Sequence, residues 1–251
     1  MKTETLQINK ESWDEVAERF FARNPLPEYG PLAPTEDELY LFGEIRDLRV
    51  LDIGCGSGHS LKYMDEQGAC ELWGLDLSST QIETAKEVLQ NCIAPVTLFE
   101  SPMEEDPGLP HNYFDIVYSI YALGWTADLN QTLANVNRYL KPGGTFIFSW
   151  EHPFYNRVRQ NDHTFIFAKS YHEEGPYDHE AWKQKAMMQQ LKVSTYVNTL
   201  IDQGFTVEKI VEEVSLKEEQ IPKHVNGWYS YDKANIVPTT MIIKSRKNEV
   251  S

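Results

Sequence analysis

The decisive stretch of this sequence is VLDIGCGSGHS, residues 50–60. It opens with a mostly apolar run, as a buried parallel strand does, and continues into three glycines and a helix start. Glycines let the backbone turn tightly and approach a ligand without an intervening Cβ, and a helix N-terminus offers free N–H groups. We therefore expect a strand, a ligand-binding turn and a helix here, with the acidic Asp52 directed toward the turn and glycines at Gly54, Gly56 and Gly58.

A glycine-rich turn after a strand has several possible uses. It could be a structural turn, a dinucleotide-binding loop or a phosphate-binding loop. The dinucleotide fingerprint G-x-G-x-x-G fails because His59 stands where its third glycine belongs. A P-loop is excluded because no Gly-Lys-Ser/Thr follows. A second acid, Asp76, stands 20 residues after Gly56 at the end of the next expected strand, where a carboxylate can take both hydroxyls of a ribose.

Outward from this segment, apolar runs alternate with helical patterns. One expected helix begins near Ser79, where Ser78-x-x-Gln81 can form a capping box. Another spans residues 129–140 and ends at Lys-Pro-Gly-Gly. Such alternation indicates βαβ crossovers and a parallel sheet. The expected strands are residues 49–53, 71–76, 96–99, 114–119 and 145–150.

Three regions depart from this alternation. Residues 11–22 place Trp13 and Phe20 on one face of an amphipathic helix. Residues 151–192 are rich in His and aromatic residues without a clean period, and we interpret them as an insertion. A helix at about 194–203 and strands at 206–213 and 239–244 then resume the alternation.

Four segments together resemble class I SAM-dependent methyltransferases, in the small-molecule group that includes the ubiquinone and menaquinone biosynthesis enzymes. WDEVAERF (13–20) also resembles the helix that lids the cofactor in this group. The resemblance implies an α/β, Rossmann-like sheet of seven mostly parallel strands, with an antiparallel last strand and helices on both faces. The four segments are VLDIGCGSG (50–58), LWGLDLS (72–78), FDIVYS (114–119) and LKPGGTFIFS (140–149).

The resemblance also implies a division of the chain and a set of cofactor contacts. One methyltransferase domain would span residues 1–251: a lid and connector (1–45), a SAM-binding core (46–150), a substrate-side insertion (151–192) and the C-terminal part of the sheet (193–251). Asp52 would reach the amino group of S-adenosylmethionine and Asp76 its ribose hydroxyls. The other implied cofactor-binding residues are Gly54, Cys55, Gly56 and Gly58 at the methionine part, Leu77, Ser101, Pro102 and Met103 at the adenine, and Ser119 and Ile120 at the sulfonium.

Three residues are candidates for acceptor binding or catalysis. His152 follows the fifth strand at the ligand edge and is held extended by Pro153. It is either a general base or substrate contact, or a hydrogen-bonded loop histidine. Tyr121 and Trp125 follow the fourth strand and are expected in the pocket wall.

The composition of the sequence argues against several kinds of binding partner. The formal net charge is −15, with Lys and Arg scattered, so binding to DNA or RNA is not expected. Three dispersed cysteines suit neither a disulfide framework nor a zinc knuckle. His163, His172 and His179 lack metal-ligand spacing, so we expect no metal site. No apolar stretch is long enough for a membrane span, so we expect a cytoplasmic protein, and no pattern indicates an oligomeric state.

Two functions from different classes fit these observations. The first is an enzyme that passes a methyl group from S-adenosylmethionine to a small-molecule acceptor, with S-adenosylhomocysteine as product. The second is a protein of the same fold that binds the cofactor without catalysis, as a regulator or partner subunit. The aromatic-rich insertion near the expected methyl-donor end favours an enclosed pocket, and so the enzyme.

Overall fold

The fold was obtained as a computed structural model, which describes residues 2–162, 164–178, 185–215 and 228–249. Seven strands form one sheet in the order β10-β11-β5-β4-β1-β2-β3. The β11 strand is antiparallel to both of its neighbours, and the other pairs are parallel. The strands are β1 (Arg49–Ile53), β2 (Glu71–Asp76), β3 (Val96–Glu100), β4 (Phe114–Ile120), β5 (Leu140–Glu151), β10 (Phe205–Val211) and β11 (Thr240–Lys247).

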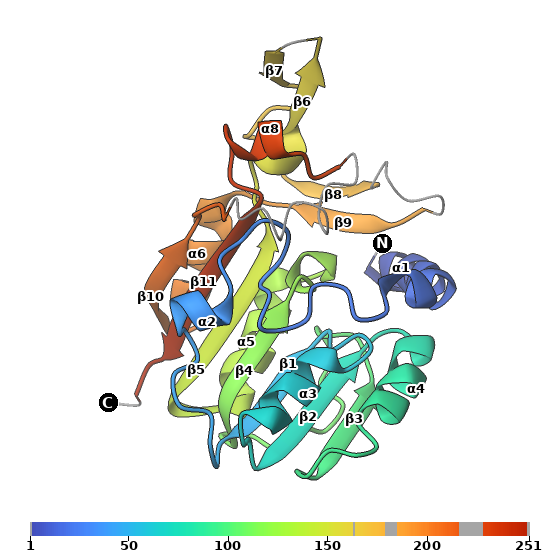
Figure 1. Cartoon of the computed structure of the whole chain (residues 1–251), viewed down its shortest axis with the longest axis vertical. Coiled ribbons are helices and arrows are strands. Elements are labelled where there is room, and N and C mark those ends of the chain that lie inside the picture. The colour runs from blue at the N-terminus through green and yellow to red at the C-terminus, as the bar shows by residue number, and fades with distance from the viewer. Residues whose placement is uncertain (1, 163, 179–184, 216–227, 250–251) are drawn as a thin grey trace.

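Helices cover both faces of this sheet (Figure 1). Alternate residues of a strand point to opposite faces, and the core divides accordingly: Val50 packs in one apolar cluster and Leu51 in the other. The first cluster includes Leu61 of α3 and Ile82 of α4, and the second includes Leu133 of α5. The helices are α2 (Glu36–Leu39), α3 (His59–Glu66), α4 (Ser79–Val88), α5 (Leu129–Tyr139) and α6 (Val193–Asp202).

Several further elements gather at the carboxyl end of the parallel strands. Figure 1 shows helix α1 beside the hairpin of β8 and β9, with the hairpin of β6 and β7 projecting beyond the rest. These elements are α1 (Lys2–Val16), η1 (Ala17–Phe20), η2 (Leu123–Trp125), η3 (Tyr155–Arg157), β6 (Val158–Asn161), β7 (Thr164–Phe167), β8 (Gly175–Asp178), β9 (Met187–Gln190) and α8 (Tyr231–Ala234).

The expected strands and helices of the core are confirmed, with shifts at three places. The first helix runs over residues 2–16 instead of 11–22 and ends in a 3-10 turn. Residues 140–144 end helix α5 as expected, yet they already belong to β5, because Leu140 pairs with Phe114. The insertion, for which no period was found, forms two hairpins in its described part.

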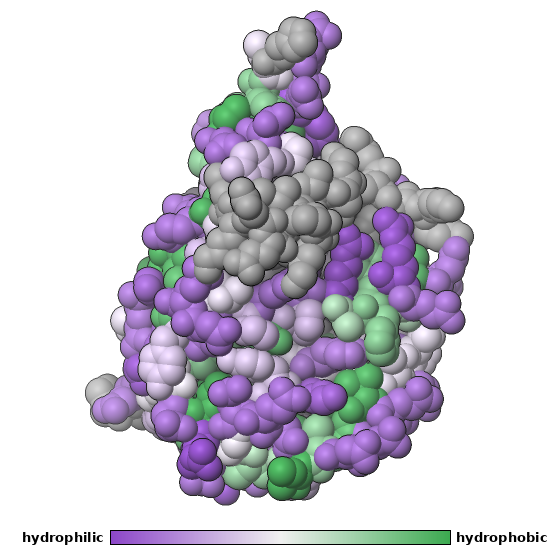
Figure 2. Space-filling view, in the orientation of Figure 1, coloured by the Kyte–Doolittle hydropathy of each residue, from purple (hydrophilic) through white to green (hydrophobic). Residues whose placement is uncertain are grey.

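The face drawn in Figure 2 is mostly hydrophilic, with apolar residues in small separate patches. This agrees with the strong negative charge of the sequence. In the part of the chain that the structure describes, no helix is both long and apolar enough to cross a membrane.

Candidate functional site

The loop between β1 and α3 depends on glycines. Gly54, Gly56 and Gly58 have φ of +81°, +51° and +80°, in the left-handed region that side chains with a Cβ avoid. A Cβ on Gly54 would lie 2.3 Å from the Cβ of Ala122, which follows β4. The bare backbone therefore runs between the ends of β1 and β4, at the switch point where open α/β sheets bind ligands.

A cavity of about 260 Å³ opens at this edge. Its walls come from the glycine loop, the ends of β2 and β5, the loops after β3 and β4, and the segment from α1 to residue 25. Twelve residues expected at the site line it: Asp52, Gly54, Cys55, Gly56, Asp76, Leu77, Ser101, Pro102, Met103, Ile120, Tyr121 and Trp125.

Asp76, the last residue of β2, is fixed by two backbone donors. Its Oδ2 accepts a hydrogen bond from the N–H of Gly56 at 2.9 Å, and its Oδ1 accepts one from the N–H of Ser78 at 2.9 Å. Burial raises the pKa of Asp76, although these two hydrogen bonds oppose the shift. Each carboxylate oxygen keeps a second lone pair, so the group can accept two further hydrogen bonds from a ligand.

Asp52 is the second buried acid of this wall. Its side chain is 2% exposed, and its Oδ1 has no hydrogen-bond partner among the described residues. Burial, and then the charge of Asp76, raise the pKa of Asp52 well above its ordinary value. A buried carboxylate without a partner is costly. A cationic or hydrogen-bond-donating ligand in the cavity would offset that cost.

The cavity continues past β2 and β3 over apolar and small polar groups. Leu77, Ser101, Pro102 and Met103 line this part. The N–H of Ser101 is bonded to the carbonyl of Asp76 at 2.9 Å, which ties the loop after β3 to the end of β2. Buried Gln81 on α4, which sequence reasoning missed, also lines the cavity, and its Oε1 has no partner in the described part of the chain.

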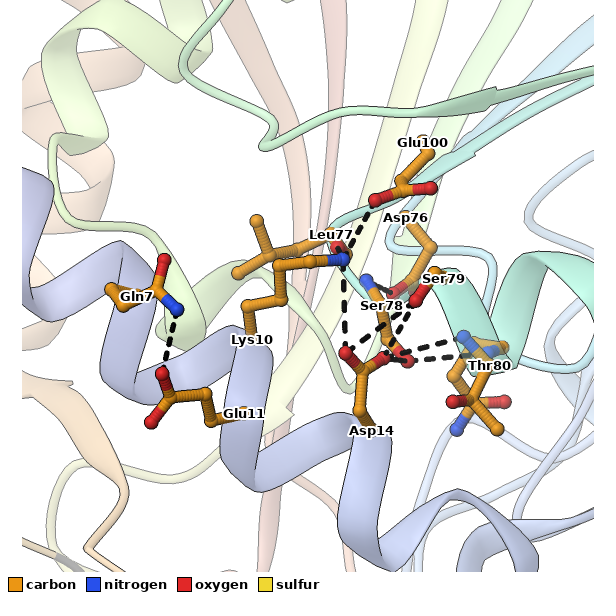
Figure 3. A network of polar contacts seen from close by, with 11 residues as sticks. Gln7, Lys10, Glu11, Asp14, Asp76, Leu77, Ser78, Ser79, Thr80 and Glu100 are labelled. Carbon is orange, nitrogen blue, oxygen red and sulfur yellow. Dashed lines mark hydrogen bonds and ion pairs between the residues drawn. The ribbon is translucent and has the colours of Figure 1, made fainter.

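Helix α1 is bound to the loop after β2, as Figure 3 shows. The Oδ1 atom of Asp14 accepts hydrogen bonds from the Oγ of Ser78 at 2.6 Å and from the N–H of Thr80 at 3.3 Å. Lys10 Nζ donates to the carbonyl of Leu77 at 3.2 Å and to Glu100 Oε1 at 2.7 Å. The helix therefore covers the cavity at the end where Asp76 lies.

A second contact binds the same helix to the insertion. The amide of Asn9, fully buried, donates to the carbonyl of Met187 at 2.8 Å and accepts from the N–H of Met187 at 2.9 Å. Trp13 packs edge-on against Trp125, with ring centroids 5.1 Å apart. Helix α1 thus closes the cavity by bridging β9 and the start of α4.

Aromatic side chains form the other end of the cavity. Trp150 lies 5.6 Å from Tyr121 and 6.3 Å from Trp125 between ring centroids. Gly124 makes room for it, because a Cβ there would lie 1.9 Å from the indole of Trp150. Four residues that sequence reasoning did not place in the site complete this wall: Trp150, Met188, Trp228 and Tyr229.

Glu151 is the charged residue of this aromatic end. It is the last residue of β5, lines the cavity and is 3% exposed. Its Oε2 accepts hydrogen bonds from Trp228 Nε1 at 2.6 Å and from the hydroxyl of Tyr229 at 3.2 Å. Its Oε1 has no partner among the described residues. Sequence reasoning missed this residue, although an acid directly after the apolar TFIFSW was the available signal.

His152, the residue expected as a base, lies outside the cavity lining. Its Nδ1 accepts a hydrogen bond from the N–H of Phe154 at 3.1 Å, so its Nε2 donates to Glu212 Oε1 at 2.7 Å. Burial lowers the pKa of His152, while the hydrogen bond and charge of Glu212 oppose that shift. Since both ring nitrogens are engaged, the geometry matches the hydrogen-bonded loop histidine and corrects the expectation that this side chain faces an acceptor.

Two expected cofactor contacts also lie outside the lining. Gly58 faces α4, where a Cβ would lie 3.0 Å from Leu89 and 3.1 Å from Ala85. It is therefore a packing glycine. Ser119 is fully buried and donates its hydroxyl to the carbonyl of Ile53 at 2.9 Å, which joins β4 to β1.

Within the described ranges, no group of three or more His, Cys, Asp and Glu could hold a metal ion. His172 lies in the described part of the insertion, whereas His163 and His179 fall outside the described residues. The cavity is lined by carboxylates, glycine backbone and aromatic rings, together with Arg19, Arg23 and His59.

Comparison with known proteins adds the family. A sequence profile described as a methyltransferase domain matches residues 51–148. An uncharacterized protein of Haemophilus influenzae is 29% identical over 224 residues, 84% of this chain and 85% of that protein. A ubiquinone biosynthesis O-methyltransferase of Vibrio parahaemolyticus is 27% identical over 158 residues, 60% of this chain and 62% of that protein.

A solved structure extends the likeness over most of the chain. The S-adenosylmethionine dependent methyltransferase from Mesorhizobium loti superposes with a TM-score of 0.71 at 27% identity. The superposition covers 83% of this chain and 95% of that one. Its coverage exceeds that of the matched profile, so the likeness is not confined to the central sheet.

Proposed function

We propose that this chain, which belongs to the SAM-dependent methyltransferases, transfers the methyl group of S-adenosylmethionine to a small-molecule acceptor by in-line displacement. After losing its methyl group, the donor is left as S-adenosylhomocysteine. The observation that carries the proposal is a single cavity, in which a carboxylate-lined end and an aromatic end lie under the same helix.

The carboxylate-lined end fits the donor. Bound there, S-adenosylmethionine supplies an electrophilic methyl on a positive sulfur. Asp76 would accept the two ribose hydroxyls with its remaining lone pairs, and the unpartnered Oδ1 of Asp52 would take the cationic amino group, directly or through water. The backbone from Gly54 to Gly56 would pack along the methionine part, because any side chain at Gly54 would meet Ala122.

The remaining cavity residues divide between adenine and sulfonium. We assign Leu77, Ser101, Pro102 and Met103 to the adenine and Ile120 to the sulfonium end, since all of them line the cavity. The aromatic faces of Tyr121 and Trp125 would steady the positive charge by about 0.5–2 kcal/mol. The role of these residues is to hold the reactants in place, because the displacement requires the acceptor atom about 3–3.5 Å from the methyl carbon in a site without water.

The walls of the cavity support the proposal of a small acceptor. Helix α1 and the β8–β9 hairpin meet over it through Asn9, and aromatic rings fill the wall opposite. A protein or nucleic-acid chain would have to open these contacts, and the net charge of −15 repels phosphate backbones. In this proposal residues 1–251 act as one domain, in which segments 1–45 and 151–192 supply the walls around the acceptor.

Calorimetry of the purified protein tests the donor site. We expect saturable binding of S-adenosylhomocysteine and none of NAD. Asp76→Ala should weaken that binding about 100-fold or more, because it removes two hydrogen bonds to a charged group. Asp202→Ala, an exposed acid at the end of α6, is the matched control and should bind like the wild type. Wild-type affinity in Asp76→Ala would refute the ribose assignment.

A labelling experiment tests the size of the acceptor. The protein is incubated with methyl-labelled S-adenosylmethionine and a cell extract separated by ultrafiltration. We expect label in new compounds of the low-mass fraction. Label confined to protein or nucleic acid would contradict the small-molecule assignment while leaving the donor site intact.

A further inference from the structure

The aromatic end of the cavity contains one carboxylate whose hydrogen bonding is half complete. Both donors to Glu151, Trp228 and Tyr229, bind its Oε2. The Oε1 atom is left without a partner in the described part of the chain, although the residue is 3% exposed. Leaving a buried charged acceptor unpaired is expensive, so such a group calls for a ligand that supplies the missing donor.

The surroundings restrict what that ligand is. The rings of Tyr121 and Trp125 lie 5.6 and 6.3 Å from that of Trp150 between centroids, and the three rings offer flat apolar faces. Such a wall favours a planar body, while the carboxylate favours an O–H or N–H group on its edge. An anionic edge would be repelled by Glu151.

We propose that Glu151 recognises the acceptor, and that the acceptor is a planar aromatic or heteroaromatic molecule whose O–H or N–H group donates a hydrogen bond to Oε1. This inference rests on the proposed function and names its substrate class. It excludes carboxylates as the methyl-accepting group.

The same contact gives the reaction a base. The O–H or N–H bond of the acceptor breaks, and its proton passes to Oε1 of Glu151. The electron pair of the acceptor atom forms the bond to the methyl carbon, and the pair of the carbon–sulfur bond stays on sulfur. The negative charge of the carboxylate and the positive charge of the sulfonium are both lost, so the step conserves charge.

The charges around Glu151 set the pH at which it can act. Burial raises its pKa, while the hydrogen bonds from Trp228 and Tyr229 and the charges of Lys233 and Arg159 oppose that shift. Lys233 is itself buried against the ring of Tyr155, and burial lowers its pKa to about 8. The remaining titratable groups coupled to Glu151 are the phenols of Tyr121, Tyr155, Tyr177, Tyr196 and Tyr229.

Glu151→Gln separates recognition from structure. The glutamine oxygen can still accept from Trp228 and Tyr229, while its NH₂ replaces the free acceptor atom by a donor. Glu151→Ala instead removes the acceptor of both hydrogen bonds. We expect Glu151→Gln to unfold near the wild-type temperature and Glu151→Ala to unfold earlier, which distinguishes the two roles of the side chain.

The test is calorimetry with matched probes in the presence of saturating S-adenosylhomocysteine. The probes are 2-naphthol against 2-methoxynaphthalene, indole against 1-methylindole, and 2-naphthoate as the anion. Wild type should bind 2-naphthol and indole at least about 10-fold more tightly than their methylated counterparts, and it should bind 2-naphthoate most weakly. Glu151→Gln should lose that preference and gain affinity for 2-naphthoate, whereas Glu212→Gln, outside the cavity, should behave like wild type.

A pH profile supplies the second readout. With any acceptor that releases S-adenosylhomocysteine, wild-type turnover should fall on the acid side at a pH above the ordinary range of a glutamate, and Glu151→Gln should lack that limb. Equal preference in Glu151→Gln and wild type, or no saturable binding of 2-naphthol and indole to wild type, would overturn the inference. Failure to bind S-adenosylhomocysteine at all would instead overturn the proposed function.

Discussion

The two ends of the cavity are built in different ways. Most of the donor end comes from one stretch of chain, from Asp52 to Gln81, in which backbone N–H groups and glycines set the shape. The loops after β3 and β4 add Ser101, Pro102, Met103 and Ile120. The acceptor end is assembled from α1, the loop after β4, the end of β5, β9 and the segment before α8. Its contacts join residues as far apart as Asn9 and Met187, 178 positions away in the sequence.

This difference determines what each end can tolerate. Backbone geometry at the donor end fixes the binding surface, so most substitutions there act through strain. At the acceptor end the surface is made of side chains, so substitutions change which molecule fits while the sheet stays intact. Substitutions at the donor end should therefore change the affinity for S-adenosylhomocysteine, and substitutions at the acceptor end should change the affinity for the acceptor.

After Asp76→Ala, the largest effect is expected from Gly54→Ala, at the same end of the cavity. The new Cβ would lie 2.3 Å from the Cβ of Ala122, and the alanine would have to adopt a left-handed φ of +81°. We expect the affinity for S-adenosylhomocysteine, measured by calorimetry, to fall about 30-fold or more, since strain and steric overlap cost about 1–3 kcal/mol or more.

Gly43→Ala is the control for that experiment. Gly43 has a similar φ of +69°, yet nothing lies within 4 Å of its added Cβ. It should lose a little stability and keep its affinity. Equal losses of affinity in both variants would show that backbone strain anywhere in the chain, and not the approach to Ala122, weakens binding.

A smaller effect is expected where α1 joins the two ends. Asp14→Ala removes the hydrogen bonds to Ser78 and Thr80. Stopped-flow measurement should show S-adenosylhomocysteine dissociating about 3- to 10-fold faster. Glu11→Ala is the matched variant, because the hydrogen bond of Glu11 to Gln7 stays within the helix (Figure 3). If Glu11→Ala accelerates dissociation equally, then the stability of helix α1, and not its contact with Ser78 and Thr80, slows the release of S-adenosylhomocysteine.

The smallest effect on turnover is expected for His152→Ala. The side chain bonds Phe154 and Glu212 outside the cavity, so turnover should stay within about 2-fold of wild type, while stability falls by about 1–2 kcal/mol. Its pKa is lowered from 6.5 in the folded chain. Wild-type stability should therefore fall as the pH drops below about 6.5, and the variant should show a flatter pH dependence. A large loss of turnover at unchanged stability would restore the catalytic role.

Much of the sheet could be predicted because its strands are short apolar runs with clear ends. The bounds of β1 and β2 are those expected from RVLDI and ELWGLD, and the class I SAM-dependent methyltransferase resemblance is confirmed. The start of α1 was wrong, because residues 2–10 carry no apolar stripe yet continue the helix. The hairpins of the insertion pair only four residues per strand, too few for an alternating pattern to stand out.

The site was predictable where one stretch of chain makes it. Asp52, Asp76 and the loop glycines before Gly58 line the cavity because a strand end and its turn place them together. Glu151 and His152 are neighbours at a strand end, and the alternation of a strand sends adjacent side chains in opposite directions. The sequence favoured the histidine for its place at the ligand edge of the sheet, whereas the structure turns the glutamate to the cavity.

The two acids of the donor wall also bear on what happens after methyl transfer. The donor carries one more positive charge than the product it becomes, and the cavity that would hold it is lined by the buried Asp52 and the half-buried Asp76. Their attraction is therefore greatest before the reaction and weaker after it. With the donor bound as proposed, we expect S-adenosylmethionine to bind more tightly than S-adenosylhomocysteine, which would limit product inhibition without any moving part.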